Sequence, residues 1–453
     1  MTEDRAIRSG TGTGARVVVA TLLAVALVLA AGCGGGDKSS TRVTPADVRG
    51  AGKVVLTVWD EQVRGGQERQ IEQLNRAFER RYPNVRIRRV AQSTTDLNMS
   101  LRLAVSRQDA PDVVQANQGR QVMGELVRDG LLRPLDGYAR AYGWTSRWPE
   151  VLLDLNRFTP DGSEFGTGSL YGVSQMGEIV GVFYDRDDVP QPPTTLGAFE
   201  AQLAAAKAAG ELPIAFGNLD GWPAIHEFET LQAQYVPRQD VRDFVFGRPG
   251  ASFDTPGTRR AAAVLQSWAR RGWLGRDFQG LGYDPAWQRF ARGDGRFLIA
   301  GTWLTADLSA RGRGRIGFML MPPLEQGAPP SALGGTSLPF AITAHSRHPE
   351  VAAAYLDFLT NRNAARIMAR TDNLPAIAGA EDVAARDPLT GEVRVAWRRL
   401  IREDGLIPYL DYTTPTAYDT LTQHLAALLD GSETPRDFVT HVERDAVGYR
   451  AAG

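Results

Sequence analysis

Three tryptophans occur at positions where an indole ring can face a ligand. They lie in the segments Trp59-Asp60, Gly221-Trp222-Pro223 and Gly301-Thr302-Trp303, beside a glycine or at a strand end instead of inside a periodic apolar run. An aromatic face packs on the apolar C–H faces of a sugar, whose hydroxyls each donate and accept hydrogen bonds. Indoles combined with Asp, Asn and Gln therefore predict a cleft that binds a carbohydrate. The alternative for each ring is a place in the core.

Polar side chains at the ends of the expected strands are further ligand candidates. Asp60 follows the first strand, and its carboxylate is a strong hydrogen-bond acceptor. Asp96 lies in a loop where it could instead cap the next helix, and Asn117 and Gln118 close the third strand, where an Asx turn is the alternative. Gly335 permits close approach of the backbone to a ligand, although Gly334-Gly335 could equally mark a hinge.

The chain carries no motif typical of an exported enzyme. It has no Gly-x-Ser-x-Gly elbow, no His-Glu-x-x-His and no phosphate-cradling glycine loop. His345 and His348 are three residues apart, but Pro349-Glu350 after them predicts a helix start instead of a metal site. We therefore expect no catalytic residue, no metal and no cofactor. Because carboxylates are numerous, a hydrolase that acts on glycans with two acids stays an alternative.

Residues 1–32 have the three parts of an export signal. Arg5, Arg8 and Arg16 precede an apolar stretch of roughly 15 residues, too short to span a membrane comfortably, and small residues follow it. The residues before Cys33, the only cysteine, resemble a bacterial lipobox. That resemblance implies cleavage before Cys33, a lipid on its thiol and attachment to the extracytoplasmic face of the cell membrane. The alternative is a plain secreted protein with an incidental cysteine.

The residues after Cys33 predict a flexible tether and then a large folded body. Residues 33–51 are expected to be a tether, because the first part of this stretch is small and polar and offers little apolar surface. About 400 residues remain, more than one core normally holds, so we expect two lobes. The formal net charge of the chain is −1 and its basic residues are scattered, so we expect no nucleic-acid partner.

Strands and helices are expected to alternate in the first part of this body. The patterns predict strands over 53–59, 85–90 and 111–115 and helices over 67–81, 97–106 and 121–129. Such alternation predicts an α/β fold with an open, largely parallel sheet, whose ligands bind at the carboxyl ends of the strands. Those ends are Trp59-Asp60 and residues 91–93 and 116–118.

Later segments occur in an order that is typical of one protein family. After residues 78–85, 110–114 and 130–136 come two segments at 170–173 and 181–187, then 290–303, 334–342 and a helix over 346–359 that begins at a proline. Together they resemble, over roughly residues 52–445, the extracellular solute-binding proteins (family 1, carbohydrate type) of bacterial ABC importers. Residues 174–179 differ from the sequence that is usual in this family at the cleft between the lobes, where the type of ligand is partly decided.

The resemblance implies a two-lobed fold like that of type II periplasmic binding proteins, with the ligand cleft between lobes joined by hinge crossings. We expect lobe 1 to comprise 52–179 and 302–335, and lobe 2 to comprise 183–298 and 338–450. The resemblance also adds Asp372, near a helix end where family members often contact ligand, and Tyr412 as candidate ligand residues. It implies a monomer.

The sequence thus predicts a binding protein and not an enzyme. It would capture a mono- or oligosaccharide by hinge closure and deliver it to the permease subunits of an ABC transporter in the membrane, as the resemblance implies. Two alternatives stay open: a solute-binding protein for a solute that is not a sugar, and an exported hydrolase that acts on glycans.

Overall fold

The computed structural model describes residues 43–452, so the expected signal segment, Cys33 and the tether up to residue 42 lie outside the described residues. The last residues of the expected tether pack against the folded body instead. Val48 is buried, and the Asn84 side chain donates to the carbonyls of Val48 and Gly52 at 2.7 and 2.8 Å. Among residues 43–452, no helix is both long enough and apolar enough to cross a membrane.

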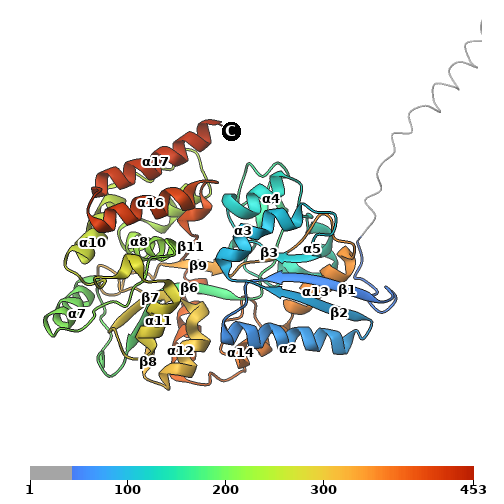
Figure 1. Cartoon of the computed structure of the whole chain (residues 1–453), viewed down its shortest axis with the longest axis horizontal. Coiled ribbons are helices and arrows are strands. Elements are labelled where there is room, and N and C mark those ends of the chain that lie inside the picture. The colour runs from blue at the N-terminus through green and yellow to red at the C-terminus, as the bar shows by residue number, and fades with distance from the viewer. Residues whose placement is uncertain (1–42, 453) are drawn as a thin grey trace, which may run out of the picture. The chain divides into compact units, whose positions relative to one another are not determined.

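The first sheet has four strands in the order β10-β3-β1-β2. Figure 1 labels three of them, β1, β2 and β3. Strands β1 (Val54–Asp60), β2 (Val85–Ala91) and β3 (Val113–Gln115) are parallel, whereas β10 (Phe340–Ile342) pairs antiparallel with β3. Helices α2 (Gly65–Arg81) and α3 (Thr94–Val105) connect the parallel strands, as the sequence predicts. The carboxyl ends of β1, β2 and β3 therefore meet at one edge of this sheet.

The elements that surround the first sheet are short except for two helices late in the chain. Helices α13 and α14 pack on α2, far from it in the sequence. The elements are η1 (Arg120–Gly124), α4 (Glu125–Arg128), α5 (Asp136–Tyr142), η2 (Trp144–Ser146), α6 (Glu150–Asp154), β4 (Arg157–Phe158), β5 (Ser169–Leu170), α13 (Pro349–Leu359) and α14 (Arg362–Arg370).

The second sheet has five strands and is built around β6 (Gly177–Asp185), all of whose residues are buried. Strand β6 pairs antiparallel with β7 (Phe297–Gly301), β8 (Ile316–Met319) and β9 (Ala332–Thr336), and β11 (Leu406–Ile407) lies parallel to β9. The largely parallel sheet predicted from the first part of the body is confirmed in the first sheet, whereas the second sheet is mostly antiparallel.

Helices account for most of the chain around the second sheet (Figure 1). They are α7 (Leu196–Ala208), α8 (Trp222–Tyr235), α9 (Arg238–Val245), α10 (Pro256–Arg270), η3 (Phe278–Gly280), α11 (Tyr283–Ala291), η4 (Thr302–Leu304), α12 (Thr305–Gly312), α15 (Pro388–Arg402), η5 (Leu410–Tyr412), α16 (Ala417–Asp430) and α17 (Pro435–Ala452).

Strand pairing departs from the expected division of the chain after residue 302. Strands β8 and β9, expected in lobe 1, pair with β6 in the second sheet. Strand β10, expected in lobe 2, pairs with β3 in the first sheet, and α13 packs beside it. The expected division also places a passage from lobe 2 to lobe 1 between residues 298 and 302. The chain makes no such passage there, because β7 before it and β8 after it both pair with β6. The chain instead returns to the first sheet between β9 and β10.

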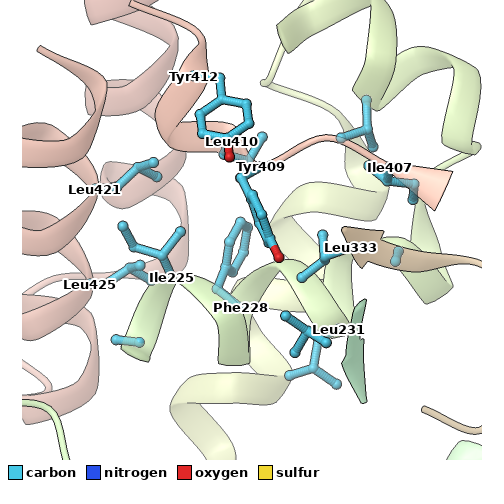
Figure 2. Close-up of a cluster of buried hydrophobic side chains, with 14 of the residues drawn as sticks. Ile225, Phe228, Leu231, Leu333, Ile407, Tyr409, Leu410, Tyr412, Leu421 and Leu425 are labelled. Atoms are coloured by element: carbon cyan, nitrogen blue, oxygen red, sulfur yellow. The ribbon is translucent and has the colours of Figure 1, made fainter. Parts of the chain in front are cut away.

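A buried cluster fixes the segment after β11 against the second sheet. Figure 2 shows side chains of α8, β9, β11, η5 and α16 packed together, with Tyr409 and Tyr412 among them. Ile225 and Phe228 of α8 and Leu421 and Leu425 of α16 contribute its aliphatic and aromatic surface. This packing orders residues 409–412, which carry two tyrosines toward the cleft described next.

Candidate ligand-binding cleft

A cleft of about 550 Å³ opens where β1 and β3 end. Glu61 directly follows β1, Asn117 follows β3 by two residues, and Glu178 comes from the start of β6 in the second sheet. The other principal lining residues come from α2, α3, α8, η4 and the segment after β11; they include Arg64, Gln67, Thr94, Asn98, Met99, Trp222, His226, Trp303, Tyr409, Asp411, Tyr412 and Tyr418.

A larger hollow of about 1050 Å³ lies elsewhere, beside β8 and α15. Its lining includes prolines of the loop at 322–330 and several alanines and arginines, with Phe318 as its aromatic residue. It lies away from the carboxyl ends of the parallel strands and gathers no group of aromatic and acidic side chains. We therefore take the smaller cleft as the candidate site.

Two indoles form part of one wall of the cleft. Trp222 begins α8, and its ring centroid lies 4.3 Å from that of Tyr283 and 6.2 Å from that of Trp303. Trp303 Nε1 donates to the Tyr283 hydroxyl at 2.7 Å. Gly301 makes this position possible, because a Cβ at residue 301 would lie 2.0 Å from the Trp303 ring. Both indoles are half-buried, so part of each ring faces the cleft.

Aromatic side chains continue this wall toward residues 409–412. The His226 ring lies 5.8 Å from Trp303 and 4.9 Å from Tyr409, and Tyr409 lies 5.5 Å from Tyr412 (Figure 2). Hydrogen bonds fix both phenols: Tyr409 donates to Glu178 Oε1 at 3.1 Å, and Tyr412 donates to Gln118 Oε1 at 3.2 Å. Together, Trp222, His226, Trp303, Tyr409 and Tyr412 are here called the aromatic wall.

Carboxyl groups face this wall in a setting that favours their protonated form. Burial, assisted by the nearby Glu61 and Asp411, raises the pKa of Glu178 to about 8. Burial, assisted by Glu229, raises the pKa of Asp411 to about 7. Burial also raises the pKa of Glu61 and lowers that of His226 to about 4, so the imidazole is neutral at pH 7.

Unligated protein is expected to lose stability as the pH rises from about 4.5 to about 8. In the folded protein, Glu178 and Glu229 each have a pKa of about 8, whereas the ordinary glutamate value of 4.5 applies to the unfolded chain. Across this window the unfolded chain has lost protons that the folded chain keeps, so unfolding becomes more favourable by up to about 1.4 kcal/mol per pH unit and group. Urea titrations at several pH values measure the slope.

The variant Glu178→Gln cannot ionise and should show a shallower slope. Glu164→Gln is the matched control, because Glu164 is exposed and outside the cleft. A slope that is the same in Glu178→Gln and the parent protein would contradict the expectation.

Four of the residues selected from the sequence line the cleft: Asn117, Trp222, Trp303 and Tyr412. Gln118 lies behind it, buried, where its Nε2 donates to Thr336 O at 2.8 Å while its Oε1 accepts from Tyr412. Gln118 therefore holds an aromatic-wall side chain in place instead of lining the cleft.

Two acidic candidates have structural partners outside the cleft. Asp60 is fully buried and forms a bidentate ion pair with Arg89, at 2.7 Å to Nε and 2.6 Å to Nη2. Asp96 accepts from the Ser93 hydroxyl at 2.6 Å, and its backbone N–H donates to Ser93, which caps α3. The capping alternative for this loop is thus close to what is found, with Ser93 as the cap.

Three more candidates lie away from the cleft. Trp59 is half-buried and packs against the core. Gly335 pairs with Glu178 within the second sheet, and a Cβ there would lie 2.4 Å from the Leu155 side chain. Asp372 is nearly buried beside Arg386.

Several lining residues that carry chemistry were not among the candidates selected from the sequence. Glu61 is adjacent to Asp60, so the strand end was identified but not the carboxyl group that lines the cleft. Glu178 lies in residues 174–179, the stretch already noted for its departure from the resemblance. Tyr409 and Asp411 precede Tyr412, and their clustering was a usable signal.

Comparison with known proteins identifies the family. A model of the bacterial extracellular solute-binding protein matches residues 65–366. The chain belongs to that family. An uncharacterised ABC transporter extracellular-binding protein of Pyrococcus horikoshii is 22% identical over 364 residues, which is 76% of this chain and 76% of that one.

Solved structures of sugar-binding proteins share the two-lobed fold. A chitin oligosaccharide binding protein superposes with a TM-score of 0.73 at 20% identity and covers 88% of this chain and 100% of its own. The solute-binding protein RafE in complex with raffinose gives a TM-score of 0.68 at 19% identity over 88% and 100%. A sugar transporter protein of Bacillus licheniformis in complex with stachyose gives 0.65 at 15% over 87% and 100%.

Proposed function

We propose that this solute-binding protein captures a mono- or oligosaccharide in the cleft by hinge closure and delivers it to the permease subunits of an ABC transporter. In the same proposal it is a monomer, held on the extracytoplasmic face of the membrane by a lipid on Cys33, and it catalyses no reaction. The observation that carries the proposal is the aromatic wall, whose half-buried indoles Trp222 and Trp303 face polar side chains across the cleft.

The chemistry of the cleft suits a sugar better than an apolar or anionic solute. Indole and phenol faces can cover the C–H faces of a pyranose, while carboxyl and amide oxygens accept from its hydroxyls. The carboxyl groups of Glu61, Glu178 and Asp411 offer an anion no positive charge and would repel it wherever they ionise. The volume of about 550 Å³ lies within the range of small-molecule sites.

Hinge closure is supported by the segments that connect the two sheets. Residues 173–176, before β6, lie beside residues 337–339, between β9 and β10, since Ser174 Oγ donates to Ser337 O at 2.6 Å. Gln118 also bonds to this second connection at Ser337 O and to Thr336 at the end of β9. A solute that contacts side chains from both sheets binds the closed state better than the open one, and this difference shifts the population.

A panel of mono- and oligosaccharides tests the proposal by thermal unfolding. A sugar that binds only the folded state stabilises it by about 2.7 kcal/mol at a hundredfold excess over Kd, so its melting temperature rises with concentration. Peptides and polyamines serve as controls for other solute classes. If no sugar raised the melting temperature while a peptide or polyamine did, the solute would not be a sugar. A hydrolysis product from any tested glycan would favour the alternative of a hydrolase.

A further inference from the structure

The ionisable residues that line the cleft are mostly acidic. The carboxyl groups are those of Glu61, Glu125, Glu178, Asp411 and Asp419, whereas the guanidinium groups are only those of Arg64 and Arg102. Both arginines are already paired: Arg102 with Glu125 at 2.9 Å and Asp129 at 2.6 Å, and Arg64 with Asp284 at 3.1 Å. The cations of the cleft therefore neutralise Glu125 but leave other acids without a partner.

Within residues 43–452, no ion pair involves Glu61, Glu178 or Asp411. Glu61 accepts from the Thr94 hydroxyl at 2.5 Å and Glu178 from the Tyr409 hydroxyl at 3.1 Å, so both partners are neutral. Arg64 attracts Glu61 only at longer range. His226, the nearest imidazole, has a pKa lowered to about 4 and supplies no charge at pH 7. Glu61, Glu178 and Asp411 are here called the acidic cluster.

Two amide side chains of the cleft have acceptors without a hydrogen-bond donor. Gln67 of α2 is only 2% exposed, and no described residue donates to its Oε1. Asn98 Oδ1, on α3, is buried and unpartnered in the same way. Buried polar atoms normally have partners, so these oxygens indicate a solute that brings donors. The cleft thus offers acceptors in excess, both charged and neutral.

The aromatic wall adds an attraction for positive charge. The face of an indole or phenol ring carries negative charge density and binds ammonium groups, and the effect grows when water is excluded. Tyr409 belongs to the aromatic wall and donates to Glu178 of the acidic cluster. A group bound between them would therefore contact both a ring face and a carboxylate.

We infer that the solute is an amino sugar, a carbohydrate with a free and protonated amine, whose ammonium group lies between the acidic cluster and the aromatic wall. This inference rests on the proposed function and names the substrate class of the same site. An ammonium group donates three hydrogen bonds and also stabilises the ionised form of the neighbouring carboxyl groups, which a neutral hydroxyl does not do. An N-acetylated sugar has no ammonium group, so it should not form this interaction with the carboxyl groups of the acidic cluster.

Calorimetric titration with matched sugars at pH 7 tests this inference. The probes are glucosamine, galactosamine, mannosamine and the glucosamine disaccharide of chitosan, each beside its hydroxyl counterpart (glucose, galactose, mannose, cellobiose) and its N-acetyl counterpart. For a sugar backbone that binds, we expect the amine to bind at least tenfold more tightly than either counterpart. Raising the salt concentration should reduce this preference, because it screens charges.

Glu178→Gln removes the carboxyl group that a bound ammonium group would ionise, because a nearby positive charge lowers its pKa, and keeps the side-chain shape. We expect it to weaken binding of the amine at least tenfold more than it weakens binding of the hydroxyl counterpart. Glu164→Gln, the same substitution at an exposed residue without a side-chain hydrogen bond or ion pair among the described residues, should leave both affinities unchanged.

The outcomes separate the two hypotheses. If neutral sugars bind as tightly as their amines, or if Glu178→Gln weakens both equally, the amino-sugar inference is overturned and the carbohydrate proposal stands. If no sugar of the panel binds, the proposed function falls and the inference falls with it.

Discussion

Replacing Trp303 by alanine is expected to weaken carbohydrate binding by roughly 30- to 1000-fold, which corresponds to about 2–4 kcal/mol. The substitution removes an indole face from the aromatic wall and, with it, the hydrogen bond to Tyr283 that holds the neighbouring ring. The sugar then loses an apolar surface that water replaces. Calorimetric titration with the tightest sugar of the panel measures the change in Kd, well below the melting temperature of the variant.

Trp59→Ala is the matched control for this experiment. Trp59 is also half-buried and packs against the core, but it does not line the cleft. We expect it to lower the melting temperature while Kd stays within twofold. Trp303→Phe keeps a ring but loses the Nε1 donor and should lie between the parent and the alanine variant. If Trp303→Ala changed Kd no more than Trp59→Ala did, Trp303 would be a core residue only.

The first sheet could be predicted from the sequence because its information is local. The valine-rich run of β1 and the apolar spacing of Ile71, Leu74 and Phe78 define a strand and a helix without reference to other segments. The helical connections in turn require parallel strands. No such rule applies to the second sheet. Strand β6 pairs with three strands from residues 297–336, and their direction relative to β6 depends on the paths of the long segments that connect them.

The candidate site was found in part for a related reason. Trp222 and Trp303 were identified because each lies close to a glycine instead of inside a periodic apolar run, which is visible in the sequence. Asp60 was misread because its partner, Arg89, lies on the neighbouring strand β2 and the pairing exists only in the sheet. The acidic cluster consists of residues from three separate parts of the chain, so no local sequence pattern predicts it.

Arg89→Ala should be among the most destabilising single substitutions in the first sheet, at a cost of about 3–5 kcal/mol. Asp60 is fully buried, and its carboxylate would lose both hydrogen bonds from the guanidinium, which also donates to Gln62 O at 2.7 Å. The cost arises mainly from a buried charge without a partner. Urea titration of the unligated protein measures it as a lower free energy of unfolding.

Two further variants determine whether the charge is the cause. Arg86→Ala deletes the same side chain from the same strand, but Arg86 is 79% exposed and lies 3.7 Å from Glu79, so its expected cost is below about 1 kcal/mol. Adding Asp60→Asn to Arg89→Ala removes the orphaned charge and should recover part of the lost stability, a coupling that independent sites do not show. If the double variant were less stable than Arg89→Ala, the loss would come from packing of the arginine stem and not from the buried carboxylate.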